Sequence, residues 1–304
     1  MKYDEKIGIS IGLPVFNGEG FISSSIDALL CQTHKNFEII ISDNSSTDST
    51  SLICEQYAKR DSRIKYIRQK QNMGAVWNFN FVLKQAKNDF FMWNSVDDIK
   101  EPEFLKKTLT ALLSNKNAVG CMSKLRYYDF PEKTSQDKIN SRFRKIRKKI
   151  KTILRKEAIH DISGPYEKKI RLFLRKTKAE MIYGVFYTKE LQQCIVDESF
   201  VGHDRAIILS LLKHGDLIVV DEVLMKCFEA GLSHTLVFHH AKILNNSTVG
   251  LLFPWNPYTN WCFRNLGWRI FLKNLDTFFL LNFFMVGTQI LDIFRVFLIK
   301  FLIK

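Results

Sequence analysis

Short apolar runs alternate with longer helical patterns through the first hundred residues, and this alternation constrains the fold more than any other feature. Each apolar run ends in a polar turn, and the next segment repeats apolar side chains at helical spacing. The apolar runs are residues 6–14, 37–41, 64–67 and 90–93, and the helical patterns are residues 21–30, 49–60 and 72–87. Strand, helix and strand in this order predict a parallel sheet with crossover helices, which is an α/β fold.

The size and composition suit a folded cytoplasmic protein. The chain has 304 residues, of which 46% are hydrophobic, enough for one large domain with an appendage or for two small domains. Six cysteines are scattered without metal-finger spacing, so we expect free thiols, as in a reducing cytosol. The first ten residues include acidic side chains and no apolar stretch of the kind found in secretory signals, so export by that route is not expected.

Two neighbouring carboxylates follow the fourth apolar run. The run at residues 90–93 leads into the sequence NSVDD, which contains Asp97 and Asp98, and a helical pattern starts near Pro102. Ligands of open α/β sheets bind beyond the carboxyl ends of the strands, and paired carboxylates there suit Mg²⁺ or Mn²⁺ that also holds phosphate oxygens. Turn and helix-capping roles explain the same pair without any ligand.

Three sequence blocks together resemble the nucleotide-binding half of the family 2 glycosyltransferases, which have the GT-A fold. The blocks are ISIGLPVFNGEGFISSSIDALLCQTHKNFEIIISDNSSTDST at residues 9–50, RQKQNMGAVWNFN at residues 68–80 and WNSVDD at residues 93–98. Their order along the chain makes the resemblance specific, whereas each block alone would be weak. The similarity is close over about the first 110 residues and looser to about residue 230.

The resemblance implies a Rossmann-like GT-A domain over residues 1–230, with its sheet flanked by helices. Residues 1–110 would form the nucleotide-binding half and residues 180–230 the acceptor half. Residues 142–156 would be a basic amphipathic insert, and residues 231–304 a helical, apolar C-terminal extension. The implied activity is inverting, metal-dependent transfer of a sugar from a nucleotide-diphosphate sugar, UDP-linked, to a glycan or lipid-linked glycan acceptor in cell-surface polysaccharide synthesis.

The resemblance assigns the nucleotide to side chains that follow the first strands. Asp43 matches the family aspartate that accepts a hydrogen bond from the uracil imide, and an acceptor-only carboxylate suits an N–H donor. The helix-cap role belongs more naturally to Asp48 or Ser46. Pro14 and Asn17 would shape the turn after the first strand, where the family lays the base and ribose. The further matching positions are Glu19, Asn72, Gly74 and Asn78. For these four, a turn or cap role is an equal alternative.

The metal block departs from the family pattern at its first acid. Relatives usually show an acidic residue, a spacer and further aspartates, whereas this chain has Ser95, Val96, Asp97 and Asp98, so the first acid is missing. The resemblance assigns Asp97 to the metal and ribose, with Asp98 as the second ligand, and phosphates and waters can complete the shell of Mg²⁺ or Mn²⁺. Candidates for a third ligand are His234, His239 and His240. Surface or packed positions are the ordinary explanation for such histidines.

The acceptor half contains two further segments that resemble the family. In MIYGVFYTKEL at residues 181–191, Gly184 would allow close backbone approach on the acceptor side. In DESFVGHDRAIILSLL at residues 197–212, Asp204 matches the family's general base at the start of a helix, and His203 replaces the first acid. The alternative role for Asp204 is a helix N-cap.

The positive charge is concentrated in one segment. Residues 142–156 hold nine Lys/Arg and no acid, which leaves +5 of the formal net charge of +14 for the remainder. Apolar side chains share one face, so the segment suits an anionic membrane surface at about 1 kcal/mol per cation, or a solvated arm that contacts acidic partners. Nucleic acid is disfavoured because no aromatic platform accompanies the charge.

The C-terminal residues 278–303 are strongly apolar, but Asp292, Arg295 and Lys300 interrupt them. The uninterrupted part is about 14 residues, shorter than the roughly 20 that cross a bilayer. We therefore expect an interfacial or partner-packed helix, ahead of a core helix or a span, and a location peripheral to the inner face of the membrane.

Two other functions stay open at the level of sequence. A nucleotide-sugar-binding protein without turnover is suggested by Val96 and His203, which replace expected acids. A basic membrane-associated adaptor is suggested by residues 142–156. The transferase prediction requires that Asp43, Asp97 and Asp204 converge on one site.

Overall fold

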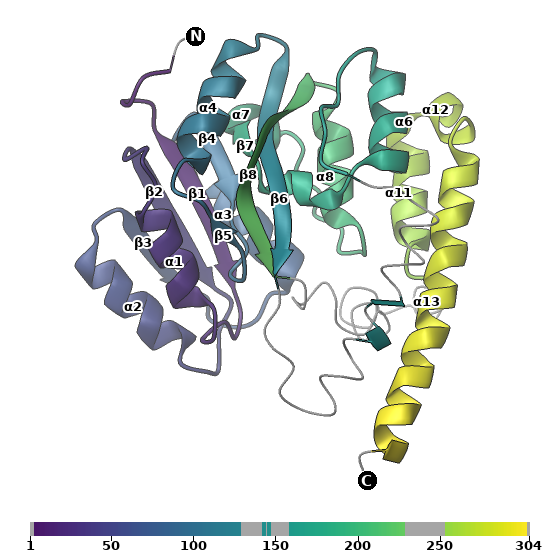
Figure 1. The fold of residues 1–304 in the computed structure, drawn as a ribbon, viewed down its shortest axis with the longest axis horizontal. Coiled ribbons are helices and arrows are strands. Elements are labelled where there is room, and N and C mark those ends of the chain that lie inside the picture. The colour runs from purple at the N-terminus through teal and green to yellow at the C-terminus, as the bar shows by residue number, and fades with distance from the viewer. Residues whose placement is uncertain (1–2, 129–141, 144, 147–157, 229–252, 303–304) are drawn as a thin grey trace.

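The computed structural model describes residues 3–128, 142–143, 145–146, 158–228 and 253–302. Within these residues, one eight-stranded sheet runs through the centre in the order β3-β2-β1-β4-β7-β6-β8-β5. Helices flank the sheet, and the last helix lies at the edge of the molecule away from β3 and α2 (Figure 1). The predicted α/β architecture is confirmed.

The first four strands form the parallel half of the sheet. They are β1 (Ile9–Val15), β2 (Phe37–Asp43), β3 (Ile64–Arg68) and β4 (Phe90–Trp93). The crossover helices are α1 (Ile22–Leu30), α2 (Thr50–Arg60) and α3 (Ala75–Lys84). β1 lies between β2 and β4, and every pair in this half is parallel. The alternation of apolar runs and helical patterns therefore predicted these seven elements, with ends that differ by a few residues.

Pro14 lies inside β1, whereas we expected it to shape the turn that follows the strand. A proline lacks the N–H that a central strand must donate to its neighbour. β4 pairs with β1 only from Ile9 to Gly12, so β1 has a neighbour on one side alone at Pro14. The strand can therefore continue through the proline to Val15.

The other half of the sheet is mixed. β7 (Val185–Tyr187) is antiparallel to β4 and to β6 (Ala118–Tyr128), while β8 (Asp216–Phe228) is parallel to β6. The two-residue strand β5 (Ile99–Lys100) closes the edge antiparallel to β8. The helices of this half are α4 (Phe104–Ser114), α6 (Tyr166–Lys176), α7 (Thr188–Gln192), α8 (His203–Leu211) and the 3₁₀ helix η1 (Ala179–Tyr183). The strands β5 and β7 are too short to give a periodic pattern in the sequence.

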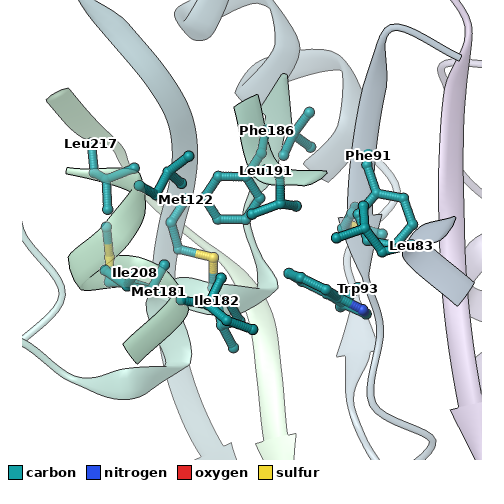
Figure 2. Close-up of a cluster of buried hydrophobic side chains, with 14 of the residues drawn as sticks. Leu83, Phe91, Trp93, Met122, Met181, Ile182, Phe186, Leu191, Ile208 and Leu217 are labelled. Atoms are coloured by element: carbon teal, nitrogen blue, oxygen red, sulfur yellow. The ribbon is translucent and has the colours of Figure 1, made fainter. Parts of the chain in front are cut away.

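Buried apolar side chains join η1 to the sheet and to the helices behind it. Figure 2 shows Met181 and Ile182 of η1 among side chains that include Trp93 and Met122. Met181 is 1% exposed and Ile182 is 3% exposed. The core therefore fixes η1 in place, which also fixes the polar residues of this short helix.

The C-terminal helices pack onto the same core. They are α11 (Asn256–Leu266), α12 (Trp268–Leu272) and α13 (Leu275–Leu302). Tyr258 and Cys262 of α11 are fully buried, and the added Cβ of an alanine at Gly202 would lie 2.7 Å from the Trp255 ring. Among the described residues, none of these helices meets the length and hydropathy of a membrane span.

Expectations about the cysteines and about the basic segment remain to be compared with the structure. All six cysteines are free thiols, as expected. Residues 142–143 and 145–146 of the basic segment are helical. The rest of that segment, the three candidate histidines at residues 234, 239 and 240, and the side chain of Asp292 lie outside the described residues.

Candidate active site

The loop that carries Asp97 and Asp98 is anchored at both ends. Asn94 is fully buried, its backbone N–H donates to the Gly12 carbonyl at 2.9 Å, and its side-chain amide donates to the Ser25 hydroxyl at 2.9 Å. Beyond β5, the Glu101 N–H donates to the Leu224 carbonyl at 2.8 Å. The loop therefore bridges β1 and β8 as a fixed element at the edge of the sheet.

The two carboxylates of this loop have different surroundings. Asp98 is 5% exposed, and its burial raises its pKa to about 7, against the opposing effect of Lys100. Asp97 is partly exposed, and its carboxylate accepts a hydrogen bond from the Ser95 hydroxyl. The Tyr128 hydroxyl donates to the Asp97 backbone carbonyl at 2.8 Å. Asp97 is therefore the more accessible of the two, with Asp98 behind it.

Lys100 is a buried cation next to these carboxylates. It is 2% exposed, and its burial lowers its pKa to about 8, opposed mainly by Asp98. Its Nζ lies 4.7 Å from the centroid of the Phe104 ring and 5.5 Å from that of Tyr183. The cation partly neutralises the carboxylate pair from inside the protein.

The donor set fits a hard divalent cation that takes further ligands from elsewhere. Adjacent carboxylates are the oxygen ligands that Mg²⁺ and Mn²⁺ accept, and such ions keep waters and phosphate oxygens in their shell. No group of three or more His, Cys, Asp or Glu side chains that could hold a metal is found in the described part of the chain. Asp97 and Asp98 therefore form at most a partial site that a bound diphosphate would have to complete.

Asp204 lies in the first turn of α8. The helix begins after Gly202, which has φ of +90°, a left-handed conformation that favours glycine. The Asp204 carboxylate accepts a hydrogen bond from the Arg205 N–H at 2.8 Å. Burial raises the pKa of Asp204, and the Arg205 charge acts in the opposite direction. A carboxylate with a raised pKa is a better proton acceptor than a free aspartate.

The His203 side chain has a structural role and does not replace the expected acid in function. Its Nε2 lies 2.6 Å from the Val196 carbonyl, to which the ring donates, and it is 9% exposed. Burial lowers the pKa of the ring, so the neutral form is favoured. The histidine thus anchors the start of α8.

Three carboxylates from two separate segments act on the phenol of Tyr183. Burial raises the pKa of Tyr183 in η1 well above its usual value, and three negative charges raise it further. These charges belong to Asp98, Asp204 and Asp97. The geometry agrees with this, because η1 packs against both α8 and β4, and the Lys100 Nζ lies 5.5 Å from the centroid of the Tyr183 ring. The loop after β4 and the start of α8 therefore meet at η1.

Glu180 adds a carboxylate that the sequence did not indicate. It accepts a hydrogen bond from the Tyr127 hydroxyl at 2.5 Å, and its charge raises the pKa of both Asp98 and Asp204. A glutamate on a five-residue 3₁₀ helix shows no motif or periodicity. Only the chain path through η1 brings it to this site.

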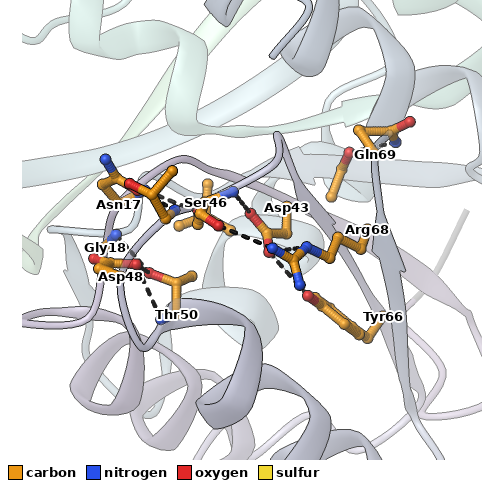
Figure 3. Close-up of polar contacts among 12 residues, drawn as sticks. Asn17, Gly18, Asp43, Ser46, Asp48, Thr50, Tyr66, Arg68 and Gln69 are labelled. Carbon is orange, nitrogen blue, oxygen red and sulfur yellow. Dashed lines mark hydrogen bonds and ion pairs between the residues drawn. The ribbon is translucent and has the colours of Figure 1, made fainter. Parts of the chain in front are cut away.

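Asp43 lies at the end of β2, opposite Val15 of β1, but its carboxylate is fully buried. It accepts hydrogen bonds from the Ser46 N–H at 2.8 Å and the Tyr66 hydroxyl at 2.9 Å (Figure 3). The Nε of Arg68 is 3.9 Å away. Tyr66 and Arg68 are two residues apart on β3 and so share a face of the strand, a signal the sequence analysis did not use.

Hydrogen bonds join the turn after β1 to the turn after β2. The Asn17 side chain accepts from the Thr47 N–H at 2.8 Å, and the Gly18 N–H donates to the Thr50 hydroxyl at 2.8 Å. The Glu19 carboxylate accepts from the Ser49 N–H at 2.9 Å. Asp48 accepts from the Thr50 N–H at 3.0 Å, two residues along the chain, which is a structural role in the turn before α2, whereas the N-cap residue of that helix is Ser49. The Cβ of an alanine at Gly18 would lie 2.9 Å from Val96, so this turn also abuts the Asp97 loop.

The remaining predicted nucleotide residues hold the start of α3. Asn72 accepts hydrogen bonds from the Asn44 amide and the Gly74 N–H, both at 2.9 Å. Gly74 has φ of +87° and caps the helix. Asn78 is 3% exposed, and its amide donates to the Ser42 carbonyl at 2.9 Å. Asn72 and Gly74 therefore have the turn and cap roles left open by the sequence, Asn78 instead joins α3 to β2, and contact with a nucleotide stays a prediction.

Gly184 lies where β7 approaches β6. A Cβ added at this position would be 2.6 Å from the Cys121 carbonyl oxygen, a backbone atom that cannot rotate away. The close backbone approach expected at Gly184 is present, while its place on the acceptor side stays a prediction.

We expect the Gly184→Ala substitution to lower the free energy of unfolding by about 1–3 kcal/mol, because β6 and β7 must separate to admit the methyl group. Denaturant titration would measure the change. Gly20→Ala is the matched control, because a Cβ there meets no atom within 4 Å. Equal unfolding free energies for the two variants would contradict the close approach.

Solved structures with this arrangement of strands and helices define the fold. The mannosyltransferase PcManGT from Pyrobaculum calidifontis, in complex with GDP-Man and Mn²⁺, matches with a TM-score of 0.59 at 13% identity, over 93% of this chain and 73% of that chain. Residues 1–349 of S. aureus TarS, in complex with UDP-GlcNAc, match with a TM-score of 0.55 at 17% identity, over 85% of this chain and 73% of that chain. The fold is GT-A.

The family follows from sequence comparison. The model of glycosyl transferase family 2 matches residues 10–167, and the chain belongs to that family. An uncharacterized glycosyltransferase of Haemophilus influenzae is 35% identical over 107 residues, which are 35% of this chain and 33% of the relative. The matches span about a third of the length of this and similar curated relatives.

Proposed function

We propose that the protein transfers a sugar from a nucleotide-diphosphate sugar, UDP-linked, to a glycan or lipid-linked glycan acceptor in cell-surface polysaccharide synthesis. The observation that carries this proposal is the packing of η1 against both α8, whose first turn contains Asp204, and β4, which leads into the Asp97 loop. This packing would bring the carboxylates proposed to serve the phosphates, Asp97 and Asp98, close to the proposed base, Asp204. Among the matched structures, TarS is in complex with UDP-GlcNAc and PcManGT is in complex with GDP-Man.

The donor side would rest on the loop after β4. Transfer leaves a nucleotide diphosphate, whose growing negative charge must be stabilised. Asp97 and Asp98 would hold Mn²⁺ or Mg²⁺, which supplies positive charge for the departing phosphate. The structure of PcManGT supports this assignment, because it is a complex with both GDP-Man and Mn²⁺.

The acceptor side would rest on α8. Asp204 would accept the proton of the attacking acceptor hydroxyl, and the raised pKa that burial gives it favours that step. A single direct displacement at the anomeric carbon inverts its configuration. Glu180 stands near both Asp98 and Asp204, where it would help to orient hydroxyl groups of the donor or acceptor sugar.

The uracil contact at Asp43 requires a local rearrangement. An ionised carboxylate has about four lone-pair sites, and the hydrogen bonds from Ser46 and Tyr66 use two of them. Acceptor capacity is therefore left for an imide N–H. Because Asp43 is fully buried, the Arg68 side chain, which is 50% exposed, would have to move aside.

A screen of nucleotide sugars tests the donor assignment. With Mn²⁺ present, we expect UDP and UDP-sugars to raise the melting temperature, because a ligand that binds only the folded form stabilises it. Release of UDP on addition of acceptor glycans would then show turnover. Binding without release would favour the nucleotide-sugar-binding protein, which the structural role of His203 also suits. No stabilisation by any nucleotide diphosphate would contradict the proposal.

A further inference from the structure

The outer face of α13 is apolar along most of its length. Side chains on this face are strongly exposed: Phe279 by 72%, Phe283 by 69%, Ile290 by 63%, Ile293 by 61% and Phe294 by 55%. At 100° per residue they fall within about 100° of the helix circumference. We call these five residues the α13 stripe. Monomeric proteins rarely expose apolar patches of this kind unless a partner or membrane covers them.

The opposite face of α13 packs against the rest of the protein near the start of the helix. Phe278 is 1% exposed and Leu281 is 2% exposed, and the Phe278 ring stacks on Phe271 with centroids 4.7 Å apart. Asp276 accepts hydrogen bonds from Arg175 of α6 at 2.8 Å. The first turns of α13 are therefore fixed on the core, and the helix lies at the edge of the molecule (Figure 1).

The basic segment begins beside the stripe. Phe143 is 8% exposed, and its ring centroid lies 6.5 Å from that of Phe294. Phe143 belongs to residues 142–156, which carry nine Lys/Arg and no acid. Arg142 next to it is exposed. Positive charge and exposed aromatic side chains therefore occur together at one place on the surface.

We propose that the α13 stripe, with the start of the basic segment at Arg142, is a docking surface for an anionic phospholipid membrane, on which α13 lies flat. Apolar side chains enter the headgroup boundary, and nearby cations are attracted to acidic lipids. A second copy of the chain would bring the same positive charge to the same face, so like charges would oppose pairing. The proposed function enters this inference at one point only, because a membrane surface is where a lipid-linked acceptor would be found.

Vesicle flotation with the 304-residue chain tests this surface. We expect binding to vesicles of phosphatidylcholine with phosphatidylglycerol, weaker binding to pure phosphatidylcholine, and loss of the difference at high salt. Phe279→Gln should weaken partitioning about tenfold, and the triple variant with Phe283→Gln and Ile290→Gln by more than about a hundredfold. Leu52→Gln is the matched control, because Leu52 on α2 is 58% exposed and remote from α13 (Figure 1).

Three results would overturn the docking surface. One is unchanged flotation of the triple variant, and another is failure of the parent chain to float with either vesicle. The third is a dimer, measured by light scattering, that Phe279→Gln separates, which would make the stripe an interface between two copies. Thermal stabilisation by UDP with Mn²⁺, measured on the same variants, separates this test from the proposed function. Folded stripe variants should keep that stabilisation, and an Asp97→Ala variant should keep vesicle binding.

Discussion

Asp204→Asn should lower the rate of sugar transfer by about a hundredfold to ten-thousandfold, because a positioned general base contributes an effect of that size. Asparagine keeps the shape and can still accept the hydrogen bond that the Arg205 N–H donates at 2.8 Å, so α8 should stay folded. It cannot take a proton from the acceptor hydroxyl. Donor binding, measured by calorimetry with UDP, should stay nearly unchanged while initial rates of transfer fall.

The pH dependence gives this prediction a second readout. A base must be deprotonated to act, so the rate should rise with pH through the pKa of Asp204. Burial raises that pKa above 3.8. The rate of transfer should therefore begin to rise, along the acid limb of the pH profile, at a higher pH than it would with a free aspartate as the base. Asp197→Asn is the control, because its carboxylate is 78% exposed, and it should leave the profile in place. Turnover that survives in Asp204→Asn with the same acid limb would remove Asp204 from the reaction.

Asp97→Ala should abolish the metal dependence of nucleotide binding. In the unaltered protein, a chelator should weaken UDP binding by at least about tenfold, or about 1.4 kcal/mol. The variant should bind UDP weakly whether Mn²⁺ or chelator is present, because Asp98 alone is 5% exposed and poorly presented to a ligand. Titration calorimetry under both conditions would measure the four affinities.

Asp221→Ala serves as the control for lost negative charge. Its carboxylate is 93% exposed on β8, and the variant should keep the full response to chelator. If Asp97→Ala binds UDP as tightly as the unaltered protein, both with and without chelator, then Asp97 holds no metal. Such a result would leave the base assignment at Asp204 standing.

Periodicity predicted the parallel half of the sheet well because each element there is long enough to repeat. β4 is apolar and buried at every position, and β2 is buried at all but one position with an apolar centre at residues 39–41, which is typical of strands covered on both faces. β5 has two residues and β7 has three, so neither shows a period. These two short strands nevertheless determine where Asp98 and Gly184 lie.

The candidate site was predictable only where a side chain follows directly from a regular element. Asp97 drew notice because it follows a strand, and the resemblance to the family then assigned roles to Asp97 and to Asp204, which opens a helix. Glu180 and Lys100 have no such marker, and their importance comes from contacts across the fold. The environment of Asp43 was also hidden, because a strand pattern indicates which face a residue occupies but not that Tyr66 will donate to it.

The packing of α11 on α8 bears on where this catalytic unit ends. Gly202 lies two residues before the candidate base Asp204. A Cβ added at Gly202 would contact the rings of Trp255 and Tyr258, and Tyr258 is fully buried. A chain shortened at residue 230 would keep every residue assigned to sugar transfer and still lose the aromatic wall behind the first turn of α8. The C-terminal helices therefore support the first turn of α8 by packing. The part of the chain needed for function extends beyond the residues that are proposed to react.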